Sequence, residues 1–321
     1  MLVNFLWHFH QPIYRLPKSG QTILPWVNYH TTKNYWQMLK LIEENEFPCT
    51  INLVPCLLEQ IKDYQNQLAS DPVLASLTRS ADDLSEEDIL RLKRFFPKEA
   101  QGASGRELQD KVLRSFFSPL LLPDKKDKRE LLNLRQQILS DLFNYFQRLY
   151  RKKIIELTVS PYYHPLLPLL IDLNQASPEA SGLPDFKYRE DARWQLQEAR
   201  EYFHQLFGFA PAGLWPSEGA LSQAACQEIA SAGFSLTFTD EHILWKSLKA
   251  GPDPGLLYHP YQCGGTAILF RDRELSDLIG FEYQRWPAEL AVADFLRRLE
   301  ARARIAGEEA ICSIILDGEN P

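Results

Sequence analysis

Two acidic residues stand just after short apolar runs and have the chemistry of a catalytic pair. Glu218 lies in the stretch Gly-Leu-Trp-Pro-Ser-Glu-Gly, and Asp317 lies in Ile-Leu-Asp-Gly-Glu-Asn-Pro. Cleavage of a glycosidic bond needs two carboxyl groups that flank the bond, one as a nucleophile or base and the other as an acid with a raised pKa. If the two runs are separate strands of one parallel barrel, these carboxylates can reach opposite sides of a sugar. The structural alternatives are a helix cap for Glu218 and a turn for Asp317.

Other polar side chains also follow apolar runs. In a parallel α/β barrel the carboxyl ends of all strands open on one face, and that face holds the active site. We therefore expect these groups to gather around one mouth, where histidines could hydrogen-bond sugar hydroxyls and a tryptophan could stack on a sugar ring. The candidate substrate-binding residues are His10, Gln11, His164, Trp215, Asp240, Glu241 and Asp277.

Structural roles compete with these functional ones. His10 could be a core histidine, and His164 could shape a turn, because the residue before a proline is held extended. Asp240 could be the N-cap of the following helix, a role that Asp often fills. Asp272 follows Arg271 in a run of alternating charge, so an ion pair is the favoured interpretation there.

The order of apolar runs and amphipathic stretches predicts an α/β fold. Short apolar runs indicate buried strands, and the stretches between them have helical length, which favours parallel pairing with right-handed crossovers. The series predicts an incomplete (β/α)7 barrel, with an open doubly wound sheet as the alternative. The predicted strands are 3–7, 50–54, 154–159, 212–215, 234–238, 267–270 and 312–316, and the clearest predicted helices are 34–44, 189–207, 220–232 and 288–304.

Residues 66–135 interrupt this alternation. The stretch is charged and helix-prone, and Ser and Asp residues in Ser-Ala-Asp-Asp-Leu-Ser-Glu-Glu-Asp offer helix caps. We expect a helical insertion between the second and third strands. It could act as a lid over the active site or form a solvated accessory subdomain.

Composition limits the partners and the compartment. The 321 residues carry a formal net charge of −7, which makes nucleic acid an unsuitable partner. The five cysteines are scattered and form no Cys-x-x-Cys pair, which argues against a disulfide framework and against a cysteine zinc site. The N-terminal segment is too short and too polar to span a membrane. These features predict a soluble cytoplasmic protein without a cofactor.

Four motifs resemble, in order, the conserved regions of glycoside hydrolase family 57. They are His-Phe-His-Gln-Pro, Pro-Tyr-Tyr-His-Pro-Leu-Leu-Pro-Leu-Leu, Gly-Leu-Trp-Pro-Ser-Glu-Gly-Ala-Leu-Ser and Ile-Leu-Asp-Gly-Glu-Asn-Pro. Residues 52–61, 238–244 and 270–281 are also similar to its amylopullulanase and α-amylase-like branch. The resemblance implies an incomplete (β/α)7 barrel, Glu218 as nucleophile and Asp317 as general acid/base. It also implies that His10, His164 and Trp215 contact the sugar.

The resemblance further implies a retaining hydrolase of α-glucans, with α-1,4 and also α-1,6 linkages of starch or glycogen as candidate targets. A 4-α-glucanotransferase or branching enzyme of the same family is the alternative activity. Because family members continue beyond the fourth region, we expect that their C-terminal helical domain is missing here, which leaves a non-catalytic carbohydrate-binding barrel as another alternative. A metal-dependent deacetylase is disfavoured, because the sequence lacks Thr-Phe-Asp-Asp-Gly and His-x-x-x-His-Pro motifs. The oligomeric state is left open.

Overall fold

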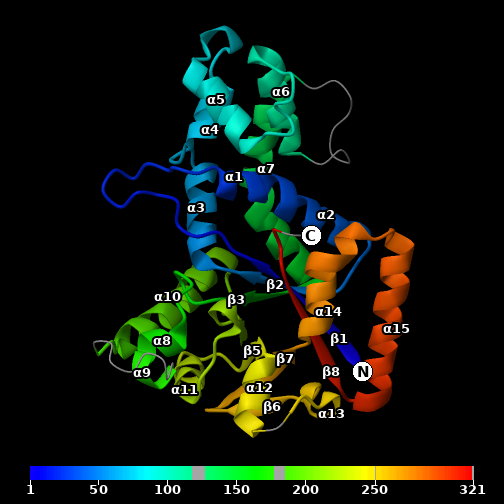
Figure 1. The fold of residues 1–321 in the computed structure, drawn as a ribbon. Coiled ribbons are helices and arrows are strands. Elements are labelled where there is room, and N and C mark those ends of the chain that lie inside the picture. Colours follow the sequence, from blue (N-terminus) through cyan, green and yellow to red (C-terminus); the bar gives the residue numbers. More distant parts are fainter. Residues whose placement is uncertain (118–126, 177–184, 250, 320–321) are drawn as a thin grey trace. The chain divides into compact units, whose positions relative to one another are not determined.

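The computed structural model describes residues 1–117, 127–176, 185–249 and 251–319 (Figure 1). The chain divides into two compact units. The first comprises Met1–His10, Phe47–Cys56 and Tyr150–Pro321, and the second comprises Gln11–Glu46 and Leu57–Leu149. Within the described ranges, all the strands belong to the first unit.

A ring of parallel strands forms the centre of the first unit. The order is β5-β4-β3-β2-β1-β8-β7, and a further pairing of β5 with β7 closes the ring. The predicted barrel is therefore confirmed, with one strand fewer than the eight of a complete (β/α)8 barrel, and the open sheet is excluded. The seven strands are β1 (Leu2–Phe9), β2 (Cys49–Leu53), β3 (Ile155–Val159), β4 (Gly213–Leu214), β5 (Leu236–Asp240), β7 (Thr266–Arg271) and β8 (Ile311–Asp317).

Each of the seven predicted strands overlaps one of these observed strands. The sequence analysis missed β6 (Tyr261–Cys263), which pairs antiparallel with β7 and lies outside the parallel ring. Side chains of β1, β5, β7 and β8 pack with Trp215 in one hydrophobic cluster. Burial of this cluster accounts for the apolar character of the runs from which the strands were predicted.

Helices connect the strands of the first unit. The helix α10 (Arg189–Phe207) has the predicted bounds, and it ends because Gly208 adopts a left-handed conformation with φ of 82°. The others are α8 (Leu167–Ile171), α9 (Leu173–Ala176), α11 (Gln223–Ser231), α12 (Glu241–Leu248), α13 (Pro254–Leu257), α14 (Arg273–Asp277) and α15 (Ala288–Ala306). None of the described helices of the chain combines the length and the apolar composition needed to cross a bilayer.

The second unit is helical and has its own apolar core, built around residues such as Leu92, Phe96 and Phe116. Its helices between β2 and β3 confirm the predicted insertion, and the unit also takes in the segment between β1 and β2. A capping box between Ser85 and Asp88 begins α5, within the predicted cap sequence. The helices are α1 (Trp26–His30), α2 (Trp36–Glu44), α3 (Pro55–Gln65), α4 (Pro72–Thr78), α5 (Glu86–Phe95), α6 (Gly105–Ser115) and α7 (Lys128–Arg151), of which α3 and α7 extend into the first unit.

Gly318, next to the candidate acid Asp317, is held against β1. Its backbone N–H donates to the His8 carbonyl at 2.9 Å, and a methyl group on Gly318 would overlap the ring of Phe9. Phe9 is fully buried and cannot move aside. We expect Gly318→Ala to destabilise the protein by roughly 1–3 kcal/mol through overpacking.

Thermal unfolding followed by circular dichroism tests this prediction. Gly251→Ala is the matched control, because a methyl group there meets open space. Equal melting temperatures for the two variants would contradict the close approach of Gly318 to the Phe9 ring.

Candidate active site

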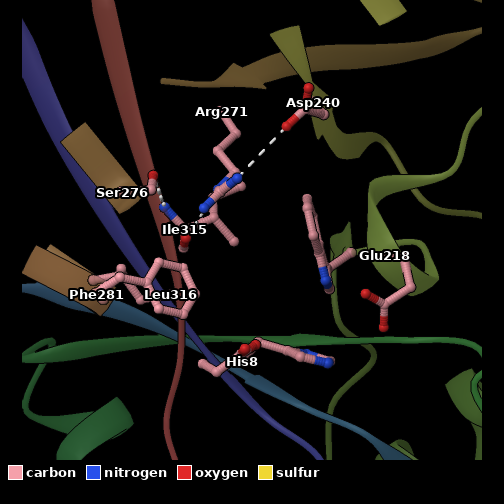
Figure 2. A pocket seen from close by; sticks show the side chains of 11 residues that line it. His8, Glu218, Asp240, Arg271, Ser276, Phe281, Ile315 and Leu316 are labelled. Atoms are coloured by element: carbon pink, nitrogen blue, oxygen red, sulfur yellow. Dashed lines mark hydrogen bonds and ion pairs between the residues drawn. The ribbon is translucent and has the colours of Figure 1, made fainter. Parts of the chain in front are cut away.

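A pocket opens among the carboxyl ends of the barrel strands and contains both predicted catalytic carboxylates. Its wall is formed by β1, β5, β7 and β8, by the turn after β4 and by the segment around α14 (Figure 2). The lining residues are His8, Trp215, Glu218, Asp240, Arg271, Ser276, Gly280, Phe281, Ile315, Leu316 and Asp317.

Glu218 is presented to the pocket by a strained turn. It lies in the 3-10 turn Ser217–Gly219 after β4 and adopts left-handed angles, with φ of 56° and ψ of 21°. The hydroxyl of Thr239 donates to the Gly219 carbonyl at 2.5 Å, which ties this turn to β5. Left-handed non-glycine residues are costly, and they persist where the surrounding structure fixes them, often at functional sites.

The helix-cap interpretation of Glu218 is wrong. The following helix α11 begins at Gln223, and Ser222 caps it by accepting the Ala225 N–H at 3.2 Å. Gly219 follows with φ of 65°, and a Cβ there would stand 3.0 Å from the Trp215 ring. The turn therefore packs its glycine on the tryptophan, while the Glu218 side chain remains solvent-accessible.

The two carboxyl groups influence each other electrostatically. Partial desolvation raises the pKa of Glu218, and the negative charge of Asp317 raises it further. Desolvation also raises the pKa of Asp317, although Arg271 and His10 oppose that change. Both side chains are accessible to solvent at the pocket surface, so the walls of the pocket remove only part of their hydration. Such a coupled pair can hold a proton on one member while the other is ionised.

Arg271 is the cation of this pocket. Its Nη2 donates to Asp277 Oδ1 at 2.7 Å, its Nε donates to the Ile315 carbonyl at 3.1 Å, and its Nη1 lies 3.6 Å from Asp240 Oδ2. Figure 2 shows the contact with Asp240. Asp277 is not among the described residues that line the pocket. Its contact with the site is the hydrogen bond that it accepts from Arg271.

Asp240 lies at the pocket and also caps a helix, while its role in substrate binding stays a prediction. It lines the pocket, and it also caps α12 by accepting the His242 N–H at 2.9 Å. Its neighbour Glu241 lines a different cavity and accepts the Arg273 N–H at 3.3 Å. The two adjacent candidates are therefore not brought together in one pocket.

Asp272 has the structural role that the sequence favoured. It is buried, and it accepts from Arg302 Nε at 2.5 Å and from the Tyr258 hydroxyl at 2.7 Å. The partner is the distant Arg302, whereas Arg271 turns towards Asp277 and Asp240. Through these bonds Asp272 links α14 and α15 to the barrel.

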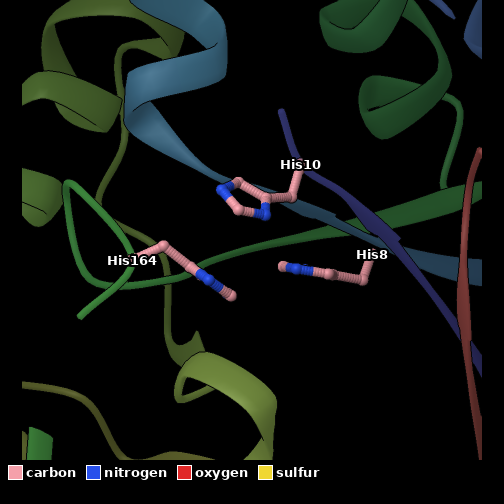
Figure 3. A group of neighbouring side chains, drawn as sticks. All are labelled: His8, His10 and His164. Carbon is pink, nitrogen blue, oxygen red and sulfur yellow. The ribbon is translucent and has the colours of Figure 1, made fainter. Parts of the chain in front are cut away.

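Three histidines meet beside the pocket (Figure 3). The ring centroids of His10 and His164 are 4.1 Å apart, those of His8 and His164 are 4.9 Å apart, and those of His8 and His10 are 5.6 Å apart. Burial lowers the pKa of His8 and of His10 to about 4, and the pKa of His164 to about 2. The three imidazoles are therefore neutral near pH 7.

The loop that carries His164 is fixed by α10. The N–H of Tyr163 donates to Gln195 Oε1 at 2.7 Å, and the N–H of His164 donates to the Pro161 carbonyl at 2.9 Å. The expectation that His164 is extended because a proline follows is wrong, since its φ is 58°. The turn formed by residues 161–164 outweighs the local preference and directs the ring towards His8 and His10.

Among the titratable residues that line the pocket, sequence reasoning missed His8 and Arg271. Both stood in quoted motifs, and the period of two along a strand puts His8 and His10 on the same side of the chain. Arg271 was considered only as the partner of Asp272. Gln11, a predicted substrate contact, lies in the second unit, where it accepts from the Tyr14 hydroxyl at 2.9 Å, and its role stays a prediction.

The fold and the pocket define a class of protein, namely a parallel β/α barrel with acidic groups at the carboxyl ends of its strands. The model of glycosyl hydrolase family 57 matches residues 4–320. The chain belongs to this family. None of the curated proteins compared matches its sequence.

Solved structures share the fold at low sequence identity. An alpha-amylase from Thermotoga maritima has a TM-score of 0.64 at 17% identity, with 99% of this chain and 67% of that chain covered. A branching enzyme from Thermococcus kodakaraensis, solved with glucose, has a TM-score of 0.60 at 16% identity, with coverages of 99% and 64%. A 4-alpha-glucanotransferase from Thermococcus litoralis has a TM-score of 0.54 at 16% identity, with coverages of 99% and 34%. This chain thus spans only part of the length of these structures.

The strain at Glu218 gives a stability prediction that is independent of activity. Glu218→Gly and Glu218→Ala both remove the carboxylate, but only the alanine keeps a Cβ in the left-handed conformation. We expect the glycine variant to be more stable by about 1 kcal/mol, measured by urea unfolding.

The same pair of changes at Glu201, which is exposed within α10, is the control. There the order should reverse, because alanine is favoured over glycine in a helix by about 1 kcal/mol. An alanine variant that is the more stable of the pair at position 218 would contradict the strained turn.

Proposed function

We propose that this chain is a retaining glycoside hydrolase of α-glucans, in which Glu218 is the nucleophile and Asp317 is the general acid/base. The observation that carries the proposal is that both carboxyl groups line one pocket and that each has a raised pKa. Glu218 follows β4 and Asp317 ends β8, so they approach from different strands, which suits attack and proton donation on opposite sides of a glycosidic bond.

The mechanism has two steps. In the first, Glu218 attacks the anomeric carbon and forms a covalent bond to it, while Asp317 gives its proton to the departing glycosidic oxygen. In the second, the now ionised Asp317 takes a proton from water, which attacks the anomeric carbon and releases Glu218. A retaining mechanism of this kind calls for the two carboxyl groups to be about 5–5.5 Å apart.

The surroundings of the pair suit these steps. Desolvation of Asp317 favours its protonated form before the first step. After the first step Glu218 is an uncharged ester, so Asp317 ionises without a second negative charge beside it. The ionised Asp317 can then take a proton from the attacking water as the base of the second step.

The side chains around the pair suit a sugar ligand. Trp215 is largely buried in the pocket wall next to Glu218 and offers an apolar surface to a sugar ring. The neutral imidazoles of His8, His10 and His164 can accept hydrogen bonds from sugar hydroxyls or donate hydrogen bonds to them. Arg271 and Asp240 supply a further cation and carboxylate at the pocket.

Transfer to a second sugar is the alternative outcome of the same covalent intermediate. A 4-α-glucanotransferase or branching enzyme would deliver the glycosyl group from Glu218 to a sugar hydroxyl instead of water. This alternative activity is supported by the similarity to a structure named as a 4-alpha-glucanotransferase and to one named as a branching enzyme. Action on α-1,4 linkages, with α-1,6 linkages as a further option, belongs to the same proposal, as does assignment to the amylopullulanase and α-amylase-like branch.

The roles of the two carboxylates can be separated with an aryl maltooligosaccharide, whose phenolate leaves without protonation. We expect Glu218→Gln to abolish phenol release, with turnover lowered at least about a thousandfold. Asp317→Asn should still form the glycosyl-enzyme and release a burst of one phenol per site before stalling, since the second step lacks its base.

Glu289→Gln, on the exposed first turn of α15, is the control and should keep native turnover. Native rates in Glu218→Gln would refute the assignment of the nucleophile. Absence of any turnover in the unsubstituted chain, with amylose binding retained, would support the carbohydrate-binding barrel instead.

A further inference from the structure

The three histidines beside the pocket have the arrangement of a metal-ligand set. One ring nitrogen from each of His8, His10 and His164 can be chosen so that all three lie within 4.8 Å of one another. In Figure 3 the three rings converge from β1, from the residue that follows it and from the loop after β3. His8 lies in β1 and His10 directly follows the end of that strand, with one residue between them, and the third ligand comes from a loop anchored on α10.

The tautomer of His8 is set by a buried amide. Asn52 Nδ2 donates to Thr158 Oγ1 at 3.1 Å, and its Oδ1 accepts from the Ser160 hydroxyl at 2.9 Å. This arrangement leaves Asn52 Oδ1 facing His8 Nδ1 at 2.7 Å, so the proton resides on Nδ1. The lone pair of His8 is then on Nε2. Histidine ligands of metals are oriented in this way, by donating their second N–H to a fixed acceptor.

Two ring nitrogens of this cluster lack a partner among the described residues. His8 Nε2 and His164 Nε2 are both buried, and neither has a hydrogen-bond partner among the described residues. His8 as a whole is only 6% exposed. A buried nitrogen whose lone pair has no hydrogen-bond partner destabilises the folded protein unless a ligand binds to it.

We propose that His8, His10 and His164 form a binding site for a divalent transition metal, of which Zn²⁺ is the best match. Neutral imidazoles suit zinc, copper and nickel, whereas magnesium and calcium prefer oxygen ligands. Three histidines leave one position of a tetrahedral zinc ion open for water. Because Zn–N distances are about 2.0–2.1 Å, two bound nitrogens are at most about 4 Å apart, so binding draws the rings together by roughly an ångström.

Metal at this site would compete with the sugar. His8 lines the pocket that contains Glu218 and Asp317, and an imidazole that ligates zinc can no longer accept a hydrogen bond from a sugar hydroxyl. Zn²⁺ should therefore inhibit turnover competitively with glucan. This consequence rests on the proposed function, whereas metal binding itself does not.

The test is a titration of chelator-treated, dialysed protein with Zn²⁺ in a calorimeter, without glucan. We expect one Zn²⁺ per chain, and an affinity at least about tenfold weaker in His8→Gln and in His164→Asn. Asparagine tolerates the left-handed backbone at position 164. His204→Gln, on the exposed side of α10, is the matched control and should bind as the unsubstituted protein does.

X-ray absorption of the zinc-loaded, unsubstituted protein keeps the proposal testable if a variant does not fold. It should count three imidazole nitrogens at about 2.0–2.1 Å. No binding at millimolar Zn²⁺, an unchanged affinity in both folded variants, or fewer than three imidazoles would overturn the proposal. Glu218→Gln separates the two ideas, because it should lose turnover and still bind Zn²⁺.

Discussion

The pairing of the first strand with the last is the constraint on which the site depends. Strand β1 lies between β2 and β8, and its register with β8 runs from Leu2 opposite Ile311 to His8 opposite Asp317. A histidine from the beginning of the chain is thereby fixed beside a carboxylate from its end. The closing pair of β5 with β7 completes the ring, so the ends of all seven strands, and the turns after them, face the same side.

The site combines rigid and strained parts. The buried amide of Asn52 and the strands around it hold His8, whereas Glu218 and His164 are each delivered by turns with left-handed backbone. Such turns aim a side chain at a fixed point at the expense of local stability. Electrostatically, two carboxyl groups with raised pKa, one arginine and three neutral imidazoles share a small volume. Burial raises the pKa of both carboxyl groups, the charge of Asp317 raises that of Glu218 further, and Arg271 opposes the rise at Asp317.

Much of the fold could be predicted from the sequence because it is encoded locally. Apolar runs marked all seven strands of the ring, and the bounds of α10 followed from its amphipathic pattern. The shared mouth followed from the rule that parallel strands end on one face. That rule placed Glu218, Asp317 and Asp240 in one pocket and brought His10 to His164.

What the sequence could not provide depends on non-local packing. The choice of Arg271 between the adjacent Asp272 and the more distant Asp277 and Asp240 is decided by the course of α14, and Arg302 from α15 takes Asp272 instead. The left-handed conformation of His164 opposes the preference of a residue before proline and results from the turn on α10. His8 was missed because the predicted strand ended at residue 7, whereas β1 continues to Phe9 and buries His8 against Asn52.

The central claim is that Glu218 becomes covalently attached to the sugar. The most direct measurement is to trap that intermediate with a fluorinated maltosyl fluoride, which forms the ester quickly and releases it slowly, and to map the label by peptide mass spectrometry. The account predicts one added glycosyl group per chain, located on Glu218. A label on another residue, or active turnover of natural glucan with no label formed, would contradict it.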